Sequence, residues 1–153
     1  MKGNVIVGQS GGPTAAINSS LAGVYRTAKD RGAGKVYGML HGIQGLLQER
    51  YIDLSEYITN DLDTELLKRT PAAFLGSCRY KLPEIHEDRD VYEKIFGILD
   101  KLNIEAFIYI GGNDSMDTIK KLSDYAIVTR YSTPFIGCPK TIANELALTD
   151  HTP

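Results

Sequence analysis

Residues 106–115 run Ala-Phe-Ile-Tyr-Ile-Gly-Gly-Asn-Asp-Ser, and this stretch decides the fold. The first five residues form the apolar run of a buried strand, and helical spacing begins at Ser115. The two glycines between them let a ligand approach the backbone, and the helix start offers unpaired N–H groups and the positive end of its dipole. The stretch therefore predicts a phosphate-binding corner, in which Asp114 could hold a divalent metal.

Outward from this corner, strand-like and helix-like segments alternate along the chain. Apolar runs predict strands at residues 4–8, 35–40, 106–110 and 133–138. Helical spacing predicts helices at residues 15–32, 84–102 and 115–126, with a short helix at 63–69. The sequence therefore predicts an α/β fold with a mostly parallel, Rossmann-like sheet flanked by helices.

Several connections have turn-forming residues. Pro13 suits the first position of the first helix, and Gly42 and Gly45 indicate a tight turn followed by a packed loop. Residues 50–83 are irregular by pattern apart from the short helix. Residues 139–153 form no obvious terminal element, so we expect the chain to stop within a loop.

The composition is that of an ordinary globular domain. The chain has 153 residues, 42% of them hydrophobic and 24% charged, which is enough for one domain with a core. The net charge of −2 gives no reason to expect a nucleic-acid partner, and no apolar run approaches the roughly 20 residues that cross a bilayer. Cys78 and Cys138 have no metal-ligand spacing. We therefore expect two reduced thiols in a cytoplasmic protein without a membrane partner.

A second glycine-rich segment, Gly8-Gln-Ser-Gly-Gly-Pro-Thr14, follows the first predicted strand. It has neither the G-x-G-x-x-G of a dinucleotide site nor the Gly-Lys-Ser/Thr ending of a P-loop. By itself it is equally well interpreted as a plain tight turn. Its position favours phosphate binding, because ligands gather at the carboxyl ends of the strands in such sheets.

Two basic segments follow further along the chain. Gly76-Ser-Cys-Arg-Tyr-Lys81 combines the fixed donor fork of Arg79 with the mobile charge of Lys81, although a solvated basic loop has the same composition. In Pro139-Lys-Thr-Ile-Ala-Asn-Glu145, Lys140 could neutralise developing charge and Thr141 could donate to an oxygen. Glu145 could act as an acid, a base or a metal ligand, and the alternative for this segment is a surface turn.

Taken together, four segments resemble the phosphofructokinase family. They are Ser10-Gly-Gly12, Gly76-Ser-Cys-Arg79, Gly111-Gly-Asn-Asp-Ser115 and Pro139-Lys-Thr-Ile142, in the family's order and at its usual spacing. The resemblance covers the whole chain but less than half of a typical subunit, which implies that residues 1–153 are part of an N-terminal donor-binding domain. The family transfers a phosphoryl group from ATP or pyrophosphate, with Mg²⁺, to fructose 6-phosphate, giving fructose 1,6-bisphosphate in glycolysis.

The resemblance also implies roles for individual residues. Asp114 and Lys140 resemble the pyrophosphate-dependent branch, in which this acid would repel the α-phosphate of ATP and this lysine would stabilise the transition state. The implied donor-binding residues are Gly11, Gly12, Arg79, Lys81, Gly112 and Ser115. The implied catalytic residues are Lys140, Asp114 and Glu145, the sugar-binding residues are Thr141, Ile142 and Ala143, and the metal ligands are Asn113 and Asp114.

Three positions depart from the family's pattern. Ala143 stands where the family has the Asp that accepts the sugar proton, and a positioned base contributes typically about 10²–10⁴-fold. Glu145 is one methylene longer than the family's second Asp, and Asn113 carries no charge where the family has a metal-binding acid. In the family the sugar site also draws on a second domain and a neighbouring subunit. We therefore expect a homo-oligomer, and little or no activity from this chain alone.

Three alternatives remain open at this point. A non-catalytic phosphate- or nucleotide-binding regulatory module would keep Gly11, Arg79 and Asp114 while tolerating Ala143. A dehydrogenase-like dinucleotide domain is disfavoured by the missing glycine fingerprint. A fragment whose sheet has an uncovered edge or face would self-associate through exposed apolar surface.

Overall fold

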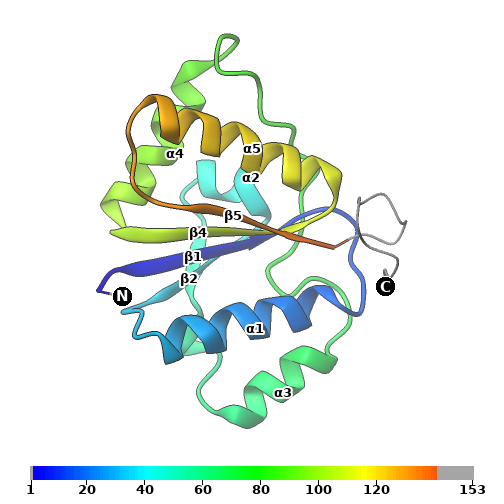
Figure 1. Cartoon of the computed structure of the whole chain (residues 1–153). Coiled ribbons are helices and arrows are strands. Elements are labelled where there is room, and N and C mark those ends of the chain that lie inside the picture. Colours follow the sequence, from blue (N-terminus) through cyan, green and yellow to red (C-terminus); the bar gives the residue numbers. More distant parts are fainter. Residues whose placement is uncertain (1, 141–153) are drawn as a thin grey trace.

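A computed structural model describes residues 2–140, in which helices cover both faces of one five-stranded sheet (Figure 1). The strands are β1 Asn4–Gln9, β2 Val36–Met39, β3 Tyr51–Asp53, β4 Ile104–Gly111 and β5 Phe135–Pro139. Their order across the sheet is β3-β2-β1-β4-β5, with only β3 antiparallel to its neighbour. The predicted α/β fold with a mostly parallel sheet is confirmed.

The helices form a layer on each face of the sheet. In Figure 1, α1 (Ile17–Asp30) and α3 (Asp61–Arg69) lie below the sheet, whereas α2 (Gly42–Leu47), α4 (Arg89–Lys101) and α5 (Asn113–Val128) lie above it. Alternate side chains of a strand point to opposite faces, so Val5 and Val7 of β1 pack with α1 while Ile6 packs in the other core cluster. β1 and β4 are therefore buried on both faces, as their apolar runs predict.

Two elements were not predicted from the sequence. The short strand β3 extends the sheet edge, and residues 42–47 form α2 instead of a turn and loop. A Cβ at Gly45 would overlap the carbonyl of Leu40, so glycine is what lets this helix pack beside the end of β2. A glycine in a short segment indicates a turn by propensity, but here the close approach of two backbones requires it.

Four helix starts also differ from the predictions. α3 begins at Asp61, two residues before its predicted start at residue 63. α1 begins at Ile17, so Pro13 lies in the loop before the helix. α4 begins at Arg89, after the Asp88 side chain accepts a hydrogen bond from the Val91 amide at 3.4 Å. α5 begins at Asn113 rather than at Ser115. In each case the apolar spacing gave the helix but not its first residue; a side-chain cap marks the start of α4, whereas α1 and α5 begin without one.

One face of the sheet is partly open. Among residues 2–140, an apolar hollow of about 440 Å³ lies beside α1, against the outer part of β4 and β5, and Ile136 is 48% exposed there. This hollow is consistent with the expected uncovered apolar surface. Self-association through it stays a prediction. Over the same residues, none of the helices is both long and apolar enough to span a membrane.

A buried polar network fixes the segment that follows α3. The Asn18 side chain donates to the carbonyls of Thr70 (2.8 Å) and Ala72 (2.6 Å) and accepts from the Phe74 amide (2.9 Å). Gln9 donates to Asn18 at 3.0 Å and accepts from the Leu75 amide at 2.8 Å. Residues 70–75 form no helix or strand. The side chains of Asn18 and Gln9 therefore supply the hydrogen-bond partners that their backbone groups would otherwise find in regular secondary structure.

We expect Asn18→Ala to lower the free energy of unfolding by about 3 kcal/mol, because each buried partner left unsatisfied costs about 1–3 kcal/mol. Urea denaturation followed by circular dichroism measures the change. Ser19→Ala is the matched control, since exposed Ser19 makes one hydrogen bond, to the Lys68 carbonyl, and should stay within about 0.5 kcal/mol of the wild type. Equal losses in both variants would contradict the role of the network.

Candidate functional site

Two glycine elbows meet where β1 and β4 end. The strands are adjacent and parallel, with Gln9 in register with Ile110, and the Ser10 amide donates to the Ile110 carbonyl at 2.8 Å. Gly11 has φ of 79°, which favours glycine, and a Cβ built on it would lie 3.5 Å from the Gly112 nitrogen. The two glycine-rich turns predicted from the sequence therefore face one another across a single space.

That space is a hollow of about 390 Å³, here called the elbow hollow. Its lining comes from three chain segments: Ser10, Gly11 and Gly12; Cys78, Arg79 and Tyr80; and Gly112, Asn113, Asp114 and Ser115. The second segment is held against the first, because Ser10 Oγ donates to the Cys78 carbonyl at 3.2 Å and Ser77 Oγ donates to the Gly11 carbonyl at 2.5 Å. Arg79, which is exposed, thus lies beside both elbows.

The α5 N-terminus opens into the elbow hollow without a side-chain cap. Gly112 is the N-cap residue, so Ser115, at which the sequence predicted the helix to begin, lies inside the first turn. Its hydroxyl oxygen is buried and, within the described part of the chain, has no hydrogen-bond partner. A Cβ at Gly111 would overlap this oxygen, which places Ser115 Oγ against the second elbow. Backbone N–H groups of a first helical turn and a free hydroxyl are suited to an anion.

Lys140 follows the end of β5 and contacts both glycine elbows, although it is not among the residues that line the elbow hollow. Its amide donates to the Gly111 carbonyl at 2.8 Å, and its side-chain Nζ donates to the Gly12 carbonyl. Only 5% of the residue is exposed, and burial lowers the pKa of the ammonium group from its ordinary value. A buried cation held by one carbonyl is incompletely compensated, so an anion bound between the elbows would stabilise its charged form.

The two expected metal ligands lie at the rim. Asn113 and Asp114 are exposed residues that line the elbow hollow, and across residues 2–140 there is no group of three His, Cys, Asp or Glu side chains that could hold a metal. Mg²⁺ often binds through one or two carboxylates, with waters and substrate phosphates completing its shell. This donor set therefore fits a cation shared with a bound phosphate, and it does not form a cage of its own.

Not every expected residue is brought to the elbow hollow. Lys81 is exposed and is not among the lining residues. Thr141, Ile142, Ala143 and Glu145 lie outside the described residues.

Sequence reasoning missed Ser77 and Tyr80. Both lie inside the quoted segment Gly76–Lys81, but hydroxyl side chains in a loop give no signal for which backbone group they contact.

The chain is similar to known proteins. Residues 4–153 match the family model described as Phosphofructokinase. A pyrophosphate–fructose 6-phosphate 1-phosphotransferase of Rhodospirillum rubrum is 42% identical over 153 residues, which is 99% of this chain and 36% of that protein. An ATP-dependent 6-phosphofructokinase of Vibrio cholerae is 36% identical over 143 residues, which is 94% of this chain and 40% of that protein.

Solved structures have the same fold. The crystal structure of a pyrophosphate-dependent phosphofructokinase from Nitrosospira multiformis superposes with a TM-score of 0.87 at 38% identity, covering 96% of this chain and 36% of that one. The chain thus spans little more than a third of the length of these relatives. Because the family model matches from residue 4 to residue 153, the chain belongs to the phosphofructokinase family.

Proposed function

We propose that residues 1–153 form the donor side of a phosphoryl transfer from pyrophosphate to fructose 6-phosphate. The observation that carries the proposal is the convergence of two glycine elbows and Arg79 on one small hollow, with the buried Lys140 in contact with both elbows. Phosphoryl transfer needs little covalent help from a protein, and it is accelerated mainly by positioning and by charge stabilisation. The glycine elbows supply backbone amides that position a phosphate, and the charged side chains beside them stabilise its charge. The ends of two adjacent strands hold these groups in place.

Each group has a distinct part in this proposal. Backbone amides of Gly11, Gly12 and Gly112 bind the phosphate oxygens, and the buried Ser115 hydroxyl donates to one of them. Arg79 binds two oxygens through its planar fork. Lys140, which approaches from β5, neutralises charge that develops as the phosphoryl group moves.

Asp114 and Asn113 are proposed to bind a divalent cation together with the donor. Mg²⁺ would neutralise phosphate charge and orient the chain of oxygens when it is bound. The Asp114 carboxylate, at the rim of the elbow hollow, would also repel a further phosphate, so it disfavours ATP relative to pyrophosphate. The higher identity to a pyrophosphate-named relative, 42% against 36% for an ATP-named one, is consistent with this choice.

The sugar side is proposed only in outline. Thr141 and Ile142 would contact the sugar, and Glu145 would have to replace the proton acceptor that Ala143 lacks. Oligomerisation and a cytoplasmic location stay predictions that follow from the resemblance and from the two unpaired thiols.

A non-catalytic phosphate-binding module is the second candidate. The alanine at position 143 favours it, because a methyl group cannot accept a proton. In that case the elbows would bind pyrophosphate or a nucleotide and regulate a partner.

We expect pyrophosphate to bind in the presence of Mg²⁺, and Lys140→Met to weaken it about tenfold to a hundredfold, because a charged hydrogen bond contributes about 1.5–3 kcal/mol. Isothermal calorimetry measures both. Lys140 binds the anion in its protonated form, and burial lowers its pKa. The wild-type affinity should therefore fall as the pH rises through that lowered pKa, and the variant should lose this dependence.

Lys29→Met is the matched control for this titration. Lys29 also donates to a glycine carbonyl, that of Gly34, but it is exposed in the last turn of α1. Its loss should leave the affinity unchanged. ATP is titrated alongside, and tighter binding of ATP than of pyrophosphate would contradict the proposed donor.

Turnover separates the enzyme from the module. With pyrophosphate, Mg²⁺ and fructose 6-phosphate, we expect the 153-residue chain to turn over at least about 10²-fold more slowly than an intact relative, because position 143 lacks a base. A coupled assay of fructose 1,6-bisphosphate measures the rate. In an intact relative carrying this chain's residues 1–153, Ala143→Asp should restore activity, and binding without turnover in that protein would favour the module.

A further inference from the structure

The segment that carries Arg79 has no regular structure of its own. Residues 70–88 connect α3 to α4 without a helix or a strand. Such a segment depends on side-chain contacts to hold its position. Asn18 and Gln9 hold its first part at residues 70–75, so the part beyond Arg79 requires a second anchor.

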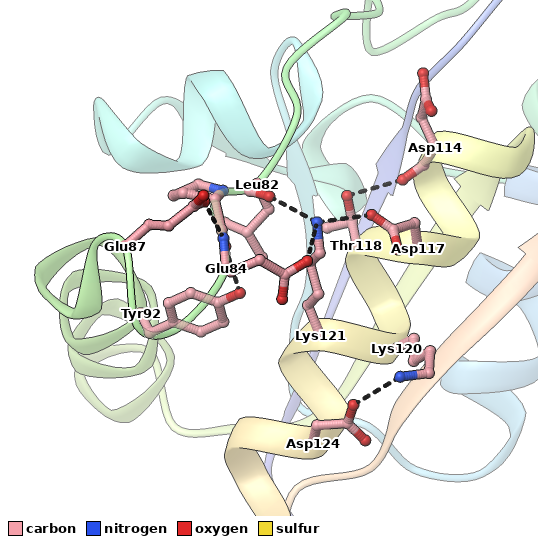
Figure 2. Close-up of polar contacts among 11 residues, drawn as sticks. Leu82, Glu84, Glu87, Tyr92, Asp114, Asp117, Thr118, Lys120, Lys121 and Asp124 are labelled. Atoms are coloured by element: carbon pink, nitrogen blue, oxygen red, sulfur yellow. Dashed lines mark hydrogen bonds and ion pairs between the residues drawn. The ribbon is translucent and has the colours of Figure 1, made fainter.

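Lys121 of α5 supplies that anchor (Figure 2). Its Nζ donates to the Leu82 carbonyl at 2.9 Å and forms ion pairs with Asp117 at 2.8 Å and Glu84 at 3.3 Å. Leu82 is itself 1% exposed in the core, three residues beyond Arg79. One ammonium group therefore joins α5 to two points of the segment.

The Lys121 side chain is only 9% exposed, in contrast to the neighbouring Lys120 at 75%. The hydrogen bond that Lys121 donates to Asp117 raises the pKa of Lys121, although burial opposes it. The group thus stays charged at neutral pH, with three partners for its three donors. A buried lysine satisfied in this way holds its geometry more firmly than an exposed pair, which contributes little.

The position of Lys121 connects this anchor to the elbow hollow. α5 begins at Asn113, so the same helix supplies both the amides of the second elbow and the lysine that holds the Arg79 segment. Six residues, or about 9 Å of helix, separate Ser115 from Lys121. A rigid helix of this length fixes the two walls of the elbow hollow relative to each other.

We propose that Lys121 is a positioning residue for phosphate binding, which holds residues 79–84 against α5 and thereby keeps Arg79 beside the two glycine elbows. This inference rests on the proposed function of the elbow hollow. A residue that only stabilised the fold would affect phosphate binding independently of Arg79. The proposal requires instead that Lys121 affects phosphate binding through the position of Arg79.

Hydrogen–deuterium exchange tests the anchor without any ligand. We expect Lys121→Met to speed exchange of the amides in residues 79–84 by about tenfold or more, while residues 70–75, held by Asn18, exchange at the wild-type rate. Lys120→Met is the matched control, since Lys120 pairs only across the exposed surface with Asp124 at 3.0 Å. Unchanged exchange at 79–84, or an equal rise throughout the chain, overturns the proposal.

A double-mutant cycle tests the connection to phosphate, with pyrophosphate and Mg²⁺ as the probe. Arg79→Ala and Lys121→Met should each weaken binding about tenfold, and the double variant should bind no more weakly than Arg79→Ala alone. Losses that multiply to about a hundredfold would show that Lys121 acts independently of Arg79, and would overturn the proposal. Lys120→Met should leave the affinity unchanged.

The two experiments distinguish failure of the proposed function from failure of the Lys121 anchor. If the wild type binds no pyrophosphate, the proposed function fails and the phosphate role of Lys121 fails with it, whereas the exchange experiment still reports whether the anchor exists. If Lys121→Met does not fold, Glu84→Gln replaces it, because Glu84 is half exposed and its loss removes one ion pair only. That variant should weaken binding about two- to fivefold and speed exchange near residue 84, and wild-type values for both would overturn the proposal.

Discussion

The parallel pairing of β1 with β4 is the constraint on which the rest of the site depends. Parallel strands end at the same edge of a sheet, so the residues that follow each of them must turn within a few ångströms of each other. The register that matches Gln9 with Ile110 brings Gly11 and Gly112 together at that edge. A shift of this register by one residue would reverse every side chain of β1 and separate the elbows. The hydrophobic pattern that buries Val5, Ile6 and Val7 on their respective faces therefore also specifies where the proposed anion site lies.

The irregular part of the site is held by hydrogen bonds that end on backbone carbonyls. Ser10 Oγ, Ser77 Oγ and Lys121 Nζ each donate to a carbonyl of a distant segment. Contacts of this kind satisfy groups that a loop would otherwise leave unpaired in a buried position. The loop that connects α3 to α4 is therefore held on both sides of Arg79, at Ser77 and Cys78 and at Leu82, although its sequence has no periodicity.

Much of the fold and part of the site could be predicted from the sequence, for identifiable reasons. Long apolar runs such as Ala106 to Ile110 gave β1, β2, β4 and β5, because burial on both faces leaves a continuous pattern. The same runs placed the two glycine elbows at one edge, whereas Arg79, in a segment without periodicity, was assigned to the site by the family resemblance. β3 and α2 were missed because three- and six-residue elements are decided by tertiary contact, as the fit of Gly45 against Leu40 illustrates. The anchoring role of Lys121 was missed because a lysine on an amphipathic helix is interpreted as solvated unless its neighbours in space are known.

Two groups that contact the glycine elbows are incompletely satisfied within residues 2–140. Lys140 is buried beside one carbonyl, with a lowered pKa, and the Ser115 hydroxyl has no partner within residues 2–140. Each of these arrangements costs free energy in the unbound chain, since buried polar groups normally have all their partners. An anion bound at the elbows would offer these groups partners, and the free energy already spent in folding them unpaired would then not oppose binding. Preorganisation of this kind distinguishes a built anion site from a glycine turn that happens to lie at a helix start, because an ordinary turn would leave its lysine in solvent.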